Sequence, residues 1–163
     1  MDDDQLAIFT TGGTIDKIYF DALSEFQVGD TAMETILREA NVAFDFKVTS
    51  LMRKDSLDLT DEDRAAIRDA IHAAPQRRVL VTHGTDTMID TALAIGDGGG
   101  RTVVLTGAMQ PASQRRSDAV FNIGFATASA LTLPPGVYVA INGRIFDPAT
   151  IRKNRDAQKF ELK

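Results

Sequence analysis

Hydroxyl and glycine residues crowd the end of an apolar run near the amino terminus, in the segment Thr11-Gly-Gly-Thr14. Adjacent glycines allow a tight turn that leaves backbone N–H groups bare, and such groups bind an anion or stabilise a charge that develops during a reaction. A threonine hydroxyl at this turn becomes a nucleophile once a base removes its proton. The phosphate-binding patterns G-x-G-x-x-G and G-x-x-x-x-G-K-[ST] are both absent from the sequence. The segment alone leaves anion binding and oxyanion stabilisation open.

Three other polar segments share this character, because each follows a short apolar or β-branched run. They are Arg53-Lys-Asp-Ser56, His83-Gly-Thr-Asp-Thr87 and Gly107-Ala-Met-Gln-Pro111. In a parallel sheet the carboxyl ends of the strands gather along one edge, where ligands bind. Four strand ends would therefore deliver hydroxyls, a carboxylate and glycine turns to one crevice. A lone glycine turn is usually structural, and it is this convergence that favours a functional site.

The runs that precede these segments predict the strands that must position them. They are short and apolar, as expected of a sheet covered on both faces. The expected strands are residues 6–10, 46–51, 79–83, 103–106 and 137–141.

Helical periodicity separates these strands. Apolar residues recur at offsets 0, 3, 4 and 7 from Met33 and again from Ile67, which is the stripe of an amphipathic helix. Thr31 and Thr60 each precede an acidic residue by three positions, the spacing of a capping box. Pro75 is expected to end the second helix.

A third helix is expected from about Asp86 to just before Gly96, and a fourth from about Gln114 to Leu131. Strands that alternate with helices of this length predict a three-layer α/β fold with a mainly parallel sheet flanked by helices.

Composition narrows the classes of protein. The 163 residues, 44% of them hydrophobic, are enough for one domain, which we expect to span residues 1–163. The lack of cysteine excludes disulfides, thiolate metal sites and a cysteine nucleophile. His72 and His83 lie too far apart, with no third ligand in view, to suggest a metal site.

Charge and hydropathy bear on partners and location. A net charge of −5 argues against a nucleic-acid partner. No apolar run approaches the ~20 residues that span a bilayer, so no membrane partner is expected. The acidic start lacks the pattern of a signal peptide. We therefore expect a soluble cytoplasmic protein.

Five motifs together resemble the amino-terminal domain of the bacterial L-asparaginases, in order and at fitting separations. They are TGGTI at 11–15, HGTDTM at 83–88, GAMQP at 107–111, SDAVFN at 117–122 and IRKN at 151–154. The resemblance covers nearly the whole chain. It implies a flavodoxin-like Rossmannoid fold and cofactor-free hydrolysis of the side-chain amide of L-asparagine to aspartate and ammonia.

The resemblance also implies catalytic residues. Thr14 matches the threonine that forms the acyl-enzyme, and Tyr19, in a mobile loop, is the candidate proton relay. Thr85 and Asp86, with Lys153, match the family's second catalytic group, in which a lysine removed from water serves as a base and a carboxylate orients it. Which threonine attacks first stays open.

The remaining implied residues bind the substrate. Ser56 matches the serine that binds the α-carboxylate, and the carboxylate that matches Asp86 also holds the α-amino group. Backbone groups near Gly13 and in the Thr85 segment would stabilise the oxyanion. Gly84 and Ala108 are expected to line the substrate pocket.

Some of these residues have plainer interpretations. Tyr19 and Phe20 could cover an edge of the core, Asp86 could cap the following helix, and a lone histidine such as His83 is usually a structural hydrogen bonder.

The sequence also departs from the family. Typical members carry a second, carboxy-terminal domain, so this chain is expected to be either a short form or a fragment. Phe26 lies in the segment where longer members keep their tyrosine, which is why the relay is assigned to Tyr19. Leu57 replaces a glutamine of longer secreted members, which predicts an altered grip on the α-carboxylate and weaker glutaminase activity.

An open crevice would need a neighbour to exclude water, so a homo-oligomer is expected. A glutaminyl-tRNA amidotransferase would need extra domains that do not fit in 163 residues. The alternative left open is a catalytically weak or inactive amino-acid-binding or regulatory module with the same fold.

Overall fold

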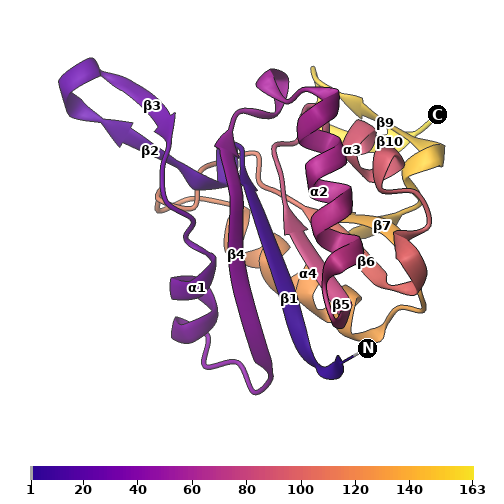
Figure 1. Cartoon of the computed structure of the whole chain (residues 1–163). Coiled ribbons are helices and arrows are strands. Elements are labelled where there is room, and N and C mark those ends of the chain that lie inside the picture. Colours follow the sequence, from indigo (N-terminus) through magenta and orange to yellow (C-terminus); the bar gives the residue numbers. More distant parts are fainter. Residues whose placement is uncertain (1) are drawn as a thin grey trace.

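A six-stranded sheet forms the centre of the computed structural model, which describes residues 2–163 (Figure 1). Its strands lie in the order β4-β1-β5-β6-β7-β8. Four neighbouring pairs are parallel and only β8 runs antiparallel to its neighbour. The bounds are β1 (Asp2–Gly12), β4 (Asp45–Lys54), β5 (Gln76–Thr82), β6 (Thr102–Thr106), β7 (Gly136–Ile141) and β8 (Arg144–Phe146).

The order of the parallel strands is the flavodoxin-like one. Counted along the chain, they lie as second, first, third, fourth and fifth. Each strand predicted from the sequence coincides with an observed strand to within a few residues. The prediction of a mainly parallel α/β fold is therefore confirmed.

Helices cover both faces of the sheet. They are α1 (Met33–Glu39), α2 (Asp61–Ala73), α3 (Met88–Ile95) and α4 (Ala119–Thr132). The apolar stripes of α2 and α3 pack on one face, together with Val79 and Val81 of β5. Those of α1 and α4 pack on the other face, together with Leu80. Because side chains alternate along a strand, the continuous apolar run of β5 serves both layers.

The capping box expected at Thr60 is present, since its side chain and that of Asp63 exchange hydrogen bonds with each other's backbone. The one expected at Thr31 is wrong. Ala32 occupies the N-cap position of α1 in a helical conformation and makes no side-chain cap. The Thr31 hydroxyl accepts the Met33 N–H at 3.2 Å, and the Ala32 N–H donates to the buried carboxylate of Asp16 at 3.2 Å, so a local and a tertiary contact together hold the start of α1.

The fourth helix begins at Ala119 rather than near Gln114. The preceding residues form turns because the Asp118 carboxylate accepts the backbone N–H groups of Met109 and Gln110 at 3.0 Å. This contact holds the segment before Ala119 in a loop, and it could not form if that segment were helical.

Two hairpins outside the main sheet were not predicted. One consists of β2 (Lys17–Phe20) and β3 (Glu25–Val28), and it extends away from the sheet (Figure 1). The segment expected to be a loop around Tyr19 is therefore a strand. The other hairpin consists of β9 (Ile151–Asn154) and β10 (Lys159–Leu162) and lies beside α3.

Short 3-10 turns complete the fold. They are η1 (Thr14–Asp16), η2 (Asp21–Leu23), η3 (Ser56–Asp58), η4 (Gly98–Gly100) and η5 (Pro148–Thr150). Between residues 2 and 163, no helix has the length and apolar character required to cross a membrane.

Candidate active site

Three loops meet at the carboxyl ends of β1, β4 and β5. A Cβ atom added to Gly13 would lie 2.4 Å from the backbone nitrogen of Gly84, and one added to Gly84 would lie 2.6 Å from Ser56 Oγ. The Gly13 N–H also donates to the Lys54 carbonyl at 2.9 Å. Gly13 has a φ of +84°, which side-chain-bearing residues rarely adopt. Glycine is thus required at these positions by backbone geometry and by the close approach of the loops.

Thr14 begins the η1 turn directly after Gly13, which itself lies against the peptide that joins His83 to Gly84. Its side chain is half-buried. Within residues 2–163 its hydroxyl takes part in no hydrogen bond, so it is free to meet a ligand.

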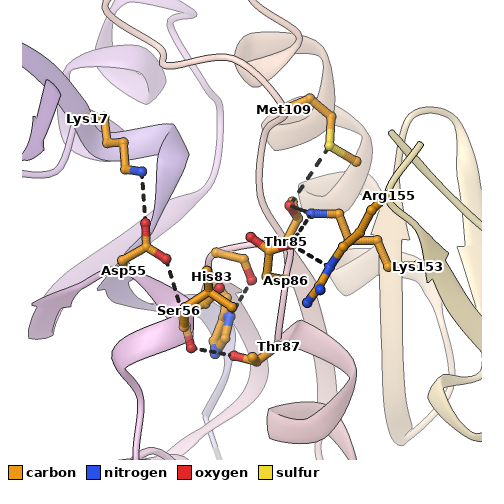
Figure 2. Close-up of polar contacts among 12 residues, drawn as sticks. Lys17, Asp55, Ser56, His83, Thr85, Asp86, Thr87, Met109, Lys153 and Arg155 are labelled. Atoms are coloured by element: carbon orange, nitrogen blue, oxygen red, sulfur yellow. Dashed lines mark hydrogen bonds and ion pairs between the residues drawn. The ribbon is translucent and has the colours of Figure 1, made fainter. Parts of the chain in front are cut away.

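Lys153, Thr85 and Asp86 form the polar centre of the site (Figure 2). The Lys153 ammonium donates to Thr85 Oγ1 and to Asp86 Oδ1, each at 2.7 Å. Lys153 comes from β9 and its side chain is 14% exposed. Arg155 Nε lies 3.4 Å from the same Asp86 oxygen. Residues that are 67 and 68 positions apart in the sequence therefore share one charge-assisted network.

In the described chain, the proton of the Thr85 hydroxyl has a single hydrogen-bond acceptor, the sulfur of Met109. Because Lys153 donates to Thr85 Oγ1, the Thr85 proton is directed elsewhere, and it points to Met109 Sδ at 3.9 Å. Thioether sulfur is a weak acceptor. The hydroxyl proton can therefore be given readily to an oxygen or nitrogen atom that enters the site.

Ser56 lies under this centre. It is only 1% exposed, and its hydroxyl has no partner in the described chain. The Ser56 carbonyl accepts the Thr87 hydroxyl at 2.7 Å (Figure 2), which fixes the turn. A buried hydroxyl without a partner costs about 1–3 kcal/mol. A bound ligand that accepts or donates at Ser56 would remove this cost.

His83 is a structural residue rather than a base. It is fully buried, and burial lowers its pKa to about 4, so the ring is neutral near pH 7. Its Nδ1 lies 2.7 Å from the Gly84 carbonyl and its Nε2 lies 2.7 Å from Thr91 Oγ1. Since a carbonyl only accepts, Nδ1 carries the proton and Nε2 accepts the Thr91 hydroxyl. Both ring nitrogens are occupied in holding the turn that carries Thr85.

The comparison with known families agrees with this geometry. The family described as Asparaginase, N-terminal matches residues 5–161. The chain belongs to this family.

Individual L-asparaginases show the same relationship. The L-asparaginase of Thermococcus kodakarensis is 32% identical over 153 residues, which cover 86% of this chain and 45% of that protein. A probable periplasmic L-asparaginase of Haemophilus influenzae is 30% identical over 160 residues, which cover 91% of this chain and 46% of that protein. The chain spans about half the length of the curated relatives it matches.

Solved structures extend the agreement to three dimensions. The thermostable L-asparaginase from Thermococcus kodakarensis superposes with a TM-score of 0.85 at 27% identity, covering 97% of this chain and 51% of that one. L-asparaginase I from Vibrio cholerae gives the same TM-score and identity, covering 98% and 51%.

Sequence reasoning missed one residue that supports this asparaginase-family site. The Asp118 carboxylate accepts four groups: the N–H groups of Met109 and Gln110, and the side-chain amides of Asn122 and Asn142. Burial works against its ionisation, but these hydrogen bonds hold the pKa of Asp118 below its usual value. Asp118 thereby fixes the loop that contains the buried Ala108. The spacing of Asp118 and Asn122 at i and i+4 was the available signal.

Tyr19 lies apart from the polar centre. It is 52% exposed on β2, and its ring packs edge-on against Phe26 with centroids 5.4 Å apart. The hairpin that carries it projects from the sheet (Figure 1). The other predicted residues are brought together at the strand ends, and no cluster of three or more histidine or acidic residues suited to a metal ion occurs among the described residues.

Proposed function

We propose that this chain is an L-asparaginase, an amidohydrolase that converts L-asparagine and water to L-aspartate and ammonia through a threonyl acyl-enzyme. The observation that carries the proposal is the position of the Lys153 ammonium, 2.7 Å from both Thr85 Oγ1 and Asp86 Oδ1. Such a network can move protons to and from an amide without a metal ion.

In the proposed reaction, Thr14 Oγ1 attacks the side-chain carbonyl carbon of asparagine. The carbonyl oxygen becomes an oxyanion, which backbone N–H groups near Gly13 and Thr85 would stabilise. Collapse of this intermediate breaks the C–N bond, and the nitrogen leaves as ammonia after it receives a proton. Water then attacks the threonyl ester, releasing aspartate and restoring the Thr14 hydroxyl. Tyr19 is the proposed relay for the Thr14 proton.

The substrate's α-carbon groups would be held at the other side of the pocket. In the described chain, the hydrogen bond from Lys153 and the contact with Arg155 both go to Asp86 Oδ1, which leaves Oδ2 for the α-ammonium group. The unpartnered hydroxyl of Ser56 would donate to the α-carboxylate. Leu57, which is 63% exposed beside Ser56, offers no hydrogen bond to that carboxylate.

Homo-oligomerisation is part of the proposal. Asp86 and Lys153 line an open groove of about 650 Å³ between α3 and the β9–β10 hairpin, whose lining does not include Thr14, Ser56 or Thr85. Water that reaches Asp86 and Lys153 from this groove would weaken their electrostatic interactions and compete for the acyl-enzyme. A neighbouring subunit would exclude it.

The decisive experiment compares Thr14→Ala with the wild type in a coupled ammonia assay with asparagine. We expect the variant to lose ammonia release and to keep its melting temperature, because the Thr14 hydroxyl makes no internal hydrogen bond. Thr35→Ala, at an exposed position of α1, is the matched control and should retain activity. Full activity in Thr14→Ala would remove Thr14 from the mechanism.

One observation favours the second candidate, an amino-acid-binding or regulatory module. Tyr19 is exposed and packs on Phe26 rather than on the polar centre, as expected if the relay were not used. Calorimetric binding of aspartate by the wild type, with no ammonia released from asparagine, would support this candidate over the enzyme.

A further inference from the structure

The β2–β3 hairpin depends on its base for its position. It exposes five apolar side chains, each 44% to 57% accessible: Ile18, Tyr19, Phe20, Leu23 and Phe26. A two-stranded hairpin is marginally stable by itself in water. The contacts where it joins the rest of the chain therefore decide where Tyr19 stands.

One ion pair contributes to this junction, together with a backbone hydrogen bond from Gly29 N–H to the Asp16 carbonyl at 2.9 Å. Lys17 Nζ lies 2.8 Å from Asp55 Oδ2 (Figure 2), and it is the only ion pair that links β2 or β3 to the remainder of residues 2–163. The Lys17 carbonyl is held as well, since it accepts the Ser113 hydroxyl at 2.8 Å. The first residue of the hairpin is thus fixed on two sides, whereas Tyr19, two residues later, has neither contact.

Asp55 connects this junction to the substrate side of the site. Its second oxygen, Oδ1, accepts the Leu57 N–H at 3.1 Å and caps the η3 turn, in which Ser56 is the first residue. Burial works against ionisation of Asp55, but the hydrogen bonds from Lys17 and Leu57 hold its pKa below the usual value. One carboxylate therefore binds the base of the hairpin and the turn that carries Ser56.

We propose that Lys17 and Asp55 are a positioning pair that holds the hairpin in register with the Ser56 turn, and so couples the placement of Tyr19 to substrate binding. The catalytic consequence rests on the proposed function, whereas the mechanical one does not. Neither side chain touches the reacting atoms in this scheme. The pair acts through Tyr19 on one side and through Ser56 on the other.

The pair should matter more for geometry than for overall stability. The side chains of Lys17 and Asp55 are 26% and 32% exposed, and partly exposed ion pairs contribute little to global stability. Its loss would release a local element while leaving the sheet and both helical layers intact.

The test is hydrogen exchange of the hairpin amides in Lys17→Met, with Asp55→Asn as a second variant that keeps an oxygen for the Leu57 cap. We expect hairpin exchange to be faster by roughly two- to fivefold in each variant, with an unchanged melting temperature. The double variant should be no faster than the single ones, because both remove the same contact. Lys17→Arg should restore slow exchange, and Arg38→Met, which breaks an exposed ion pair of α1, should leave it unchanged.

Activity provides the second measurement. In Lys17→Met, kcat for asparagine should fall by more than KM rises, because the relay is displaced while Asp55 still caps the turn that carries Ser56. Hairpin exchange that equals wild type in Lys17→Met, or an unchanged kcat, would overturn the proposal. If the wild type releases no ammonia, the proposed function fails, but the exchange measurement still decides whether the pair holds the hairpin.

Discussion

Replacing Gly84 with alanine tests whether the three loops of the site need their observed close approach. Gly84 lies between the buried His83 and Thr85, the residue proposed to transfer a proton, and its Cα faces Ser56. The substitution adds one methyl group and changes no charge. Any effect therefore reports on space alone.

The magnitude follows from the distances. The added Cβ would lie 2.6 Å from both Cβ and Oγ of Ser56 and 3.1 Å from its backbone nitrogen. Carbon atoms in contact lie at about 3.5–4.0 Å, so one loop must move by roughly 1 Å. Ser56 cannot turn away into solvent, because it is 1% exposed and its carbonyl is bound by Thr87.

We expect Gly84→Ala to lower the free energy of unfolding by about 1–3 kcal/mol, the usual cost of overpacking. The melting temperature should fall by about 2–4 °C for each kcal/mol. Ammonia release should fall by about 10²-fold, because a displacement of about 1 Å is enough to misalign reacting groups. Calorimetry and the coupled ammonia assay measure the two effects.

Gly124→Ala is the matched control. Gly124 lies in α4, and a Cβ there would meet no atom within 4 Å. Because alanine favours the helix, this variant should gain about 0.5–1 kcal/mol and keep its activity. A Gly84→Ala protein with the stability and turnover of the wild type would refute the packing argument.

Three further predictions concern the charged groups. Lys153→Met should lower kcat by about 10²–10⁴-fold with little change in melting temperature. Arg152→Met, which breaks a neighbouring exposed ion pair, should leave kcat unchanged. Equal turnover in the two variants would contradict the role of Lys153. Asp118→Ala should lower the free energy of unfolding by about 1–3 kcal/mol, because the donors it accepts lose their partner, and a urea denaturation midpoint equal to wild type would count against it. Burial raises the pKa of Asp16 from 3.8 to about 6, so the contribution of Asp16 to stability is present in full below about pH 3.8 and is lost as the pH rises through 6. His83 acts in the opposite sense. Burial lowers its pKa, so its contribution to stability is lost as the pH falls through about 4. Asp16→Asn should therefore make acidification from pH 7 to 4 cost up to about 3 kcal/mol more than in wild type, and parallel stability curves for the two proteins would show that Asp16 does not titrate in this way.

Much of the site could be predicted because its residues sit at strand ends. Short apolar runs in the sequence predicted the strands. A parallel sheet places the loops that contain Gly13, Ser56 and Gly84 at one edge. The capping box at Thr60 was equally visible, since both partners lie three residues apart. At the start of α1 the local pattern was only partly right, because the Thr31 hydroxyl accepts the Met33 N–H without a capping box and Asp16 supplies a second, tertiary contact.

The sequence by itself determined the order of strands and helices and the polar residues available at each strand end, because these follow from local periodicity and turn chemistry. The family resemblance grouped Lys153 with Thr85 and Asp86, but only the tertiary structure shows how Lys153 contacts them across 67 or more residues. Only the tertiary structure decided that Lys17 ties the hairpin to Asp55. Such contacts depend on which strands lie side by side and on where the loops close. Residue spacing along the chain does not encode that arrangement.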